Sequence, residues 1–473
     1  MATNFYNSHT LLLRIFQKGN INVKIQLRIV CLNKPFFKIL IAEWVPSLNK
    51  GELAILLGML ETFQILGKVK VSIFSFYPSL DKERYPSELN IIDVERDLYL
   101  PKSLPEKARS TQIKASLLAA FQHFLFILIY IIFSKRAKRI LKKTLWKEYC
   151  ESDLIIICHN QVSCIGGFVL DFSPVYITLL AKILRKPVVI YANGTHNLGS
   201  RVWEFLALLI LNNVDLITTR DEDSFLYLKK FVWNSARIYL TGDPSILLRP
   251  NFSEKVKDVL SMENIGKSKM LVGVALSHEV LSDAFPTIKD PSVKYQKAVI
   301  EIGCLLDNLI ERFGAQIIFV PHCIEPYRRR DDRIVAKDVY KCMKNKHKVC
   351  LIDKEYSPEE LKALISKFNL FISTRVHAAV SALSTFVPSI VITRPTDRRA
   401  YGLVGKNLGQ EEWIYNIRNL NADELFVYVK NLLLAWDKIC NNLPFIVNSA
   451  KKKALLNGIL LKALMDSRFK SKV

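Results

Sequence analysis

The feature that most constrains the fold is an alternation between short apolar runs and longer stretches of helical periodicity. We expect the runs at residues 38–43, 69–75, 153–158, 187–191, 214–218, 270–276, 315–320, 348–352, 369–373 and 389–393 to form strands. Strands that alternate with helices in this way are typical of βαβ units and a parallel sheet. The pattern therefore predicts an α/β fold class with doubly wound sheets.

Two such domains are expected, because 473 residues exceed what one ordinary core accommodates. A polar stretch of alternating charge with Pro250 divides the strands into two sets and suggests a linker. The expected parts are an N-terminal extension at 1–37, an N-terminal domain at 38–247, a linker at 248–268, a C-terminal domain at 269–421, and helices at 422–473. The last helical stretch is long enough to cross back over the first domain.

The charge balance requires an acidic partner. The chain has 67 Lys and Arg against 44 Asp and Glu, a net charge of +23. Nucleic acid, anionic lipid and a phosphorylated substrate are the candidates. The basic residues form no stripe interleaved with aromatic residues, so no nucleic-acid partner is expected.

Cysteine and histidine patterns argue against metal and disulfides. The nine cysteines form neither a CxxC pair nor a zinc spacing, and they are expected to be reduced thiols of a cytoplasmic protein. No HxH or HExxH pattern occurs, so neither a metal nor a cofactor is expected.

One apolar segment has two interpretations. Residues 115–133 contain no charged side chain and are flanked by basic residues, within a helical stretch predicted for 115–149. A spanning helix would place the motifs before and after it on opposite sides of a membrane. We therefore favour a helix that lies in the membrane interface or against the protein, with 115–143 facing an anionic membrane surface.

Polar residues and glycines gather where the expected strands end, which is where ligands bind in open α/β sheets. They include Asn49, Gly51, Glu52, Gly194, His196, Arg220, Ser277, His322, Arg375 and His377. Several have a purely structural alternative. Asn49, Gly51 and Glu52 in SLNKGELAIL could form an ordinary turn and helix cap.

Three further motifs are also open to a structural interpretation. Arg220 in TTRDEDS could pair with an acid of the next helix. Gly166 and Gly167 permit close backbone approach to a ligand, or simply a turn. His196 and His322, taken singly, are more typical of structural histidines than of ligands.

The stretch FISTRVHAAVSAL is the most informative. Arg375 and His377 lie two residues apart at an expected helix start, where exposed amide groups favour an anion. Arginine offers a planar fork that matches carboxylate or phosphate, and histidine can deliver a proton near neutral pH. The alternative is a surface arginine beside a capping histidine.

Together these motifs resemble the polysaccharide pyruvyl transferase family. SLNKGELAIL, TTRDEDS, VPH and STRVHAAVSAL occur in the order and spacing of that family's motifs, from about residue 38 to 416. The resemblance implies two Rossmann-like domains that face each other across a cleft, as in GT-B glycosyltransferases. It also implies that Arg375 and Arg220 hold the donor and that His377 donates a proton. Arg399 stands where the family commonly has a lysine, and HNQVSCIGG replaces a turn richer in glycine.

The implied activity is transfer of a pyruvyl group from phosphoenolpyruvate to a saccharide acceptor, which forms a ketal and releases phosphate. Phosphoenolpyruvate is then the donor substrate, and the protein acts in the cytoplasm, peripheral to the inner face of the membrane. Two other functions remain open: a GT-B glycosyltransferase that uses a nucleotide sugar, and a non-catalytic membrane-associated binding protein.

Overall fold

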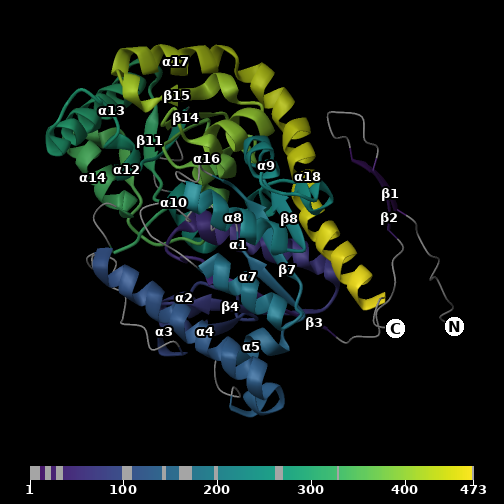
Figure 1. Ribbon diagram of the computed structural model, residues 1–473. Helices are drawn as coiled ribbons and strands as arrows, with labels where there is room; N and C mark the ends of the chain where they lie inside the picture. The colour runs from purple at the N-terminus through teal and green to yellow at the C-terminus, as the bar shows by residue number, and fades with distance from the viewer. Residues whose placement is uncertain are drawn as a thin grey trace.

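The computed structural model describes residues 11–15, 23–27, 36–97, 109–140, 145–158, 173–195, 201–261, 270–326 and 330–470. It contains two parallel sheets and one antiparallel strand pair, β1 (Leu11–Ile15) with β2 (Val23–Leu27). Helices separate the strands of both sheets along the chain (Figure 1). The prediction of an α/β fold with two doubly wound domains is confirmed.

The N-terminal sheet has seven parallel strands in the order β5-β4-β3-β6-β7-β8-β9. Their bounds are β3 (Phe37–Trp44), β4 (Val69–Ser75), β5 (Asn90–Asp93), β6 (Leu154–Ile157), β7 (Val188–Asn193), β8 (Leu216–Thr219) and β9 (Ile238–Leu240). Every residue of β6, β7 and β8 is buried. Burial on both faces explains why these strands are continuous apolar runs in the sequence.

The C-terminal sheet has six parallel strands in the order β12-β11-β10-β13-β14-β15. Their bounds are β10 (Leu271–Ala275), β11 (Gln316–Phe319), β12 (Val349–Leu351), β13 (Leu370–Ser373), β14 (Ser389–Thr393) and β15 (Ile414–Asn416). All ten expected strands are present in the two sheets, within two residues at each end. The sequence analysis missed β5, β9 and β15, which lie at sheet edges.

Helices cover both faces of the N-terminal sheet. On one face lie α4 (Arg109–Ile140), α5 (Leu145–Glu151), α7 (Ser173–Ile183), α8 (Arg201–Asn213) and α9 (Glu222–Lys229). On the other face lie α1 (Lys50–Phe63) and the end of α18 (Trp436–Lys470). Within the described residues, no helix is both long and apolar enough to span a bilayer.

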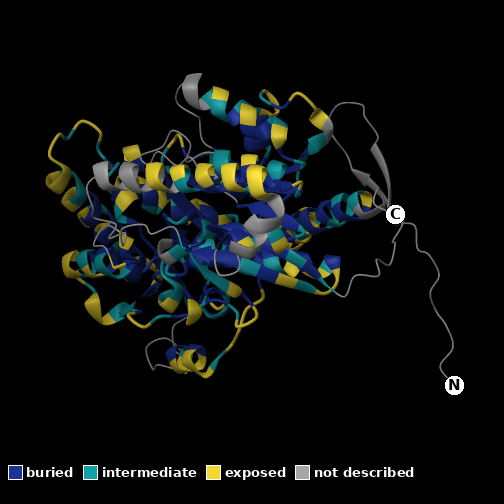
Figure 2. Ribbon diagram, turned by 60° about the horizontal axis from the view of Figure 1, so that its bottom comes forward, coloured by how far each residue is buried: buried dark blue, intermediate teal, exposed yellow. Residues whose placement is uncertain are grey.

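The C-terminal sheet is covered in the same way. Helices α12 (His278–Leu281), α13 (Pro291–Phe313), α14 (Asp332–Cys342) and α17 (Ala422–Leu434) contribute to one core, and α10 (Glu254–Ser261) and α15 (Pro358–Ile365) to the other. Helix α16 (Val376–Leu383) has residues in both cores. The range expected as a linker thus contains α10, which packs on α15. Figure 2 shows buried and exposed residues alternating along the helices of the molecule.

The two domains are joined through the start of α1. The Lys50 amide donates to the His322 carbonyl at 2.7 Å, and Asn49 forms an antiparallel bridge with Cys323. Beside this bridge, Glu355 accepts hydrogen bonds from Lys50 Nζ at 2.5 Å and from Arg84 Nε at 2.6 Å. The carboxylate belongs to the C-terminal domain and both cations to the N-terminal one.

Helix α18 is a second connection. It runs from the C-terminal helices down the side of the molecule to the N-terminal sheet (Figure 1). The buried side chain of Asn457 accepts from Thr241 Oγ1 at 2.9 Å and donates to the Gly242 carbonyl at 3.0 Å. This contact fixes the turn after β9, which leads into the 3-10 turn η3 (Pro244–Leu247).

Candidate functional site

His377 points across the boundary between the domains. It lies in the first turn of α16, after β13, and its Nε2 is 3.4 Å from Oδ2 of Asp243, which precedes η3 in the N-terminal domain. The histidine is therefore held by an acid rather than acting as a helix cap. Asp243 has no counterpart in the sequence-based site.

Arg220 contacts the same carboxylate oxygen. It follows β8, its side chain is fully buried, and its Nη1 is 3.2 Å from Asp243 Oδ2. Its ion pair thus reaches Asp243, 23 residues along the chain, although its charge also acts on Asp221, the residue that caps the next helix. Asp243 brings together the arginine and the histidine that the sequence assigned to one site.

The charge of Asp243 is strongly stabilised. Burial would raise its pKa, but the hydrogen bond with His377 and the positive charge of Arg220 outweigh burial and hold the pKa below its usual range. Its other oxygen accepts from the amide and hydroxyl of Ser245 at 2.9 and 2.6 Å. At neutral pH the group between Arg220 and His377 is therefore an ionised carboxylate.

Two glycines make room for these side chains. A Cβ atom at Gly51 would lie 2.9 Å from Cβ of His377, and one at Gly194 would lie 2.6 Å from Nε of Arg220. Any larger residue would have to displace a ring or a guanidinium group. These close approaches explain why glycine follows the expected strands at both positions.

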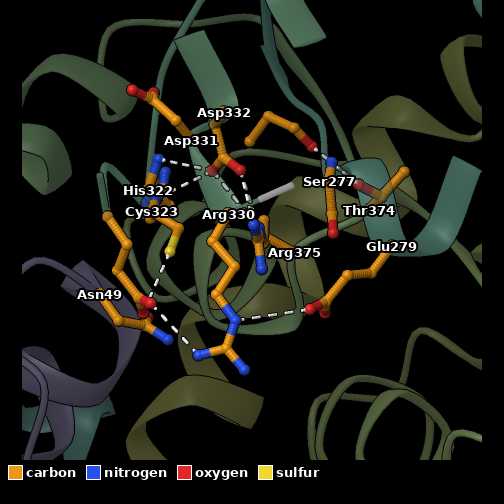
Figure 3. A network of polar contacts seen from close by, with 12 residues as sticks. Asn49, Ser277, Glu279, His322, Cys323, Arg330, Asp331, Asp332, Thr374 and Arg375 are labelled. Atoms are coloured by element: carbon orange, nitrogen blue, oxygen red, sulfur yellow. Dashed lines mark hydrogen bonds and ion pairs between the residues drawn. The ribbon is translucent and has the colours of Figure 1, made fainter. Parts of the chain in front are cut away.

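Arg375 is held by a second buried acid. Its Nε and Nη2 donate to Oδ1 of Asp332 at 3.1 and 2.6 Å. Oδ2 of Asp332 accepts the amides of His322 and Cys323 at 3.0 and 2.8 Å. Figure 3 shows Asp332 between the arginine and this turn, so the ends of β13 and β11 are linked through one carboxylate.

His322 is neutral at physiological pH. Burial and the nearby positive charges of Arg375, His377 and Lys50 lower its pKa to about 4, although its hydrogen bond with the Val320 carbonyl opposes this. His322 thus completes the cluster without adding a further charge.

Ser277 and Glu279 lie on the other side of Arg375 (Figure 3). The Ser277 amide donates to Thr374 Oγ1 at 2.6 Å, while its own buried hydroxyl has no hydrogen-bond partner among the described residues. Glu279 is 3.8 Å from Arg330, which also pairs with Glu325 at 3.2 Å. The buried hydroxyl of Ser277 can therefore form a hydrogen bond with a bound molecule.

Arg399 follows β14 and pairs with Asp397 at 3.2 Å. Burial would lower its pKa, but the charge of Asp397 and its hydrogen bond raise it, and Glu52 adds to the rise. Arg375 opposes this shift, which places Arg399 within electrostatic reach of the cluster. Asn49 caps α1, accepting the Glu52 amide, so its structural interpretation holds even at the domain boundary.

The structure thus gathers most of the sequence-based site. Arg220 and His377 share Asp243, Arg375 and His322 share Asp332, and Gly51 packs on His377. Gly166, Gly167 and His196 lie outside the described residues. The catalytic and binding roles of these residues remain predictions.

Sequence reasoning missed both organising acids. Asp243 follows β9, which the sequence analysis missed, and Asp332 lies at the start of α14, well beyond the end of β11. The described residues contain no group of three or more His, Cys, Asp or Glu side chains placed to hold a metal ion.

The chain is similar to a known protein over most of its length. The amylovoran biosynthesis protein AmsJ of Erwinia amylovora is 23% identical over 401 residues, which cover 83% of this chain and 91% of AmsJ.

Among solved structures, a putative UDP-N-acetylglucosamine 2-epimerase of Listeria monocytogenes matches with a TM-score of 0.56 and 12% identity, covering 92% of this chain and 97% of that one. The HepE protein of Anabaena, solved with UDP, matches with a TM-score of 0.51 and 11% identity, covering 91% and 100%. At these identities the likeness concerns the fold, and it confirms a GT-B-like pair of Rossmann-like domains.

The family model of polysaccharide pyruvyl transferases matches residues 49–395, from the cap of α1 to the end of β14, and so includes Arg220, Asp243, Arg375 and His377. This chain belongs to the polysaccharide pyruvyl transferase family.

Proposed function

We propose that the protein transfers a pyruvyl group from phosphoenolpyruvate to a saccharide acceptor, forming a pyruvate ketal and releasing phosphate. The observation that carries the proposal is the Asp243 carboxylate, which joins Arg220 of one domain to His377 of the other. A small trianion bound there would meet fixed cations and a proton donor together. The family membership supports pyruvyl transfer as the reaction.

In the proposed reaction, His377 donates a proton to the methylene carbon of phosphoenolpyruvate. The neighbouring carbon becomes cationic, and a first sugar hydroxyl adds to it while its proton returns to His377. Phosphate then leaves, and the second hydroxyl adds to the same carbon, its proton departing with the phosphate. One C–O bond to phosphate breaks, and two C–O bonds to the sugar form.

Arg375, Arg220 and Arg399 would hold the donor. Each charge-assisted hydrogen bond contributes about 1.5–3 kcal/mol to the free energy of binding. Asp332, Asp243 and Asp397 already fix the three guanidinium groups. Because the cations are preorganised, they would stabilise the departing phosphate without rearrangement.

The proposed setting is the cytoplasmic face of a membrane, where precursors of cell-surface polysaccharides are assembled. The similarity to AmsJ, an amylovoran biosynthesis protein, supports a saccharide acceptor. Ser277 and His322 would line the same site. Gly166, Gly167 and His196 stay candidates for contacts with the substrates.

The test is release of phosphate from phosphoenolpyruvate in the presence of a panel of sugar acceptors. We expect release that requires both an acceptor and His377, and loss of release in Arg375→Ala. The melting temperature of the unaltered protein should rise when phosphoenolpyruvate is added. Stabilisation by a nucleotide sugar alone, with no phosphate released for any acceptor, would instead identify a GT-B glycosyltransferase.

Unchanged donor turnover in both His377→Ala and Arg375→Ala would contradict the proposed roles. A matched control is Arg237→Ala, since Arg237 hydrogen-bonds only backbone carbonyls near the end of α8 in the structure's described part. This variant should retain full phosphate release.

A further inference from the structure

The outward side of α4 is apolar along most of its length. Ten large apolar residues are exposed there: Leu117, Leu118, Phe121, Phe124, Leu125, Leu128, Ile129, Ile131, Ile132 and Phe133. At 3.6 residues per turn they cover roughly 200° of the helix circumference. Exposure reaches 66% at Ile132, and turning the bottom of Figure 1 forward brings this side of α4 into view (Figure 2).

The inward side of the helix is firmly attached. Phe126 stacks on Trp146 of α5 at 4.3 Å between ring centroids, and the buried ring of His123 lies 4.0 Å from Tyr176 of α7. Ile127 is buried in the same core. Helix α4 therefore lies flat on the domain, and its apolar side faces outward as part of a rigid body.

Neighbouring helices extend this apolar side. Helix α4 packs on α7, and α7 packs on α8. Leu179 of α7 and Phe205 and Leu209 of α8 are exposed, with Phe205 at 59%. We call the outward residues of α4, α7 and α8 together the three-helix face. Exposed apolar side chains gathered on neighbouring helices are typical of a surface that binds a partner or a membrane.

The charge around α4 indicates what covers the face. Between residues 107 and 147 the sequence contains no Asp or Glu, and basic residues flank the apolar stretch on both sides. They are Lys107, Arg109, Lys114, Lys135, Arg136, Lys138, Arg139, Lys142, Lys143 and Lys147. A second copy docked face to face would bring two such basic sets together, which is repulsive. Anionic lipid headgroups would attract them instead.

We propose that the three-helix face is a membrane-docking surface that lies in the interface of an anionic lipid bilayer, with α4 parallel to the membrane plane. The apolar side chains enter the boundary between headgroups and acyl chains, and the positive charge of the flanking sequence attracts the anionic headgroups. This inference rests on exposure and charge, and not on the proposed chemistry.

The test is co-sedimentation of the full chain with vesicles of phosphatidylcholine alone or with 30% phosphatidylglycerol (roughly the anionic fraction at which basic segments bind). We expect binding to the anionic vesicles that weakens in high salt. The double variant Phe121→Glu and Phe124→Glu should lower the bound fraction about tenfold, because two phenyl rings that the bilayer would bury are lost. Phe205→Glu should lower it too, since α8 belongs to the face.

Phe445→Glu is the matched control, because Phe445 of α18 is 78% exposed and lies outside the three-helix face. It should bind vesicles as the unaltered chain does. Equal melting temperatures would show that all variants are folded. The proposal is overturned if the unaltered chain fails to bind anionic vesicles. It is also overturned if Phe205→Glu binds vesicles normally while the α4 double variant does not. A dimer that the α4 variants convert to monomers would overturn it as well. Phosphate release with a soluble acceptor separates this outcome from a failure of the proposed reaction.

Discussion

Single residues decide how the two domains share one site. Asp243 is the clearest case, since one carboxylate oxygen contacts Arg220 at 3.2 Å and His377 at 3.4 Å. The acid touches both groups while Ser245 occupies its other oxygen. Asp243 is therefore a positioning residue, and its effect on the reaction should pass through its two partners.

Replacing Asp243 by Asn tests this role. The amide retains the shape of the side chain but removes the charge that orients His377, so kcat should fall roughly 10²-fold. Phosphate release from phosphoenolpyruvate measures it. If the acid acts through the histidine, Asp243→Asn combined with His377→Asn should lose no more activity than His377→Asn alone.

The Asp243→Asn prediction has a matched control at an exposed acid. Asp353→Asn removes an exposed acid that pairs with Lys337 at 3.1 Å and should leave kcat unchanged. Fully additive losses in the double variant would show that Asp243 acts independently of His377. A melting curve of each variant confirms that the folded protein is compared.

At the scale of elements, what the sequence could predict follows how strongly each run favours a strand. Strand β14 was predicted to the residue because all of it is buried and four of its five residues are β-branched. Strand β9 was missed because its three residues include one β-branched residue and lie directly between Arg237 and Thr241. Asp243 was missed with it, whereas Arg375 and His377 were found because β13 and α16 have strong patterns.

Residues distant in sequence explain the rest. Asp332 approaches Arg375 only after β11 and β13 take their places on either side of β10. No local pattern encodes that neighbourhood. The sequence therefore identified the cations at the strand ends but not the acids that hold them.

Helix α18 gives a prediction at this scale. Asn457→Ala would leave the hydroxyl of Thr241 and the carbonyl of Gly242 without this buried partner, and should lower the free energy of unfolding by about 2 kcal/mol. Urea unfolding measures the change. Asn442→Ala on the exposed side of the same helix is the control and should stay within about 0.5 kcal/mol. Equal effects of the two changes would refute a special role for Asn457.

At the scale of the whole molecule, Glu355 links the domains with a pH dependence of known sign. Burial would raise its pKa, but the hydrogen bonds from Arg84 and Lys50 lower it to about 2. Since the folded pKa lies below the unfolded value of about 4.3, the stabilisation is fully present above that pH and is lost as the pH falls toward 2.

Glu355→Gln should therefore lower the free energy of unfolding at pH 7 by about 1 kcal/mol, a modest value because a third of the side chain is in water. At pH 3 the difference from the unaltered chain should shrink. Urea unfolding at both pH values measures it. Glu83→Gln is the matched control, since Glu83 contacts the same Arg84 but is 74% exposed. A difference that grows at low pH would contradict the assignment.

The path of α18 has a consequence for how the chain is made. The apolar face of the first sheet that α1 borders is completed by Leu460, Leu461 and Met465 of α18, which follow the whole second sheet in the sequence. A ribosome makes the chain from its N-terminus, so this face of the first domain stays open to water until the second domain has been synthesised as well. We therefore expect newly made chains that stop before residue 460 to aggregate.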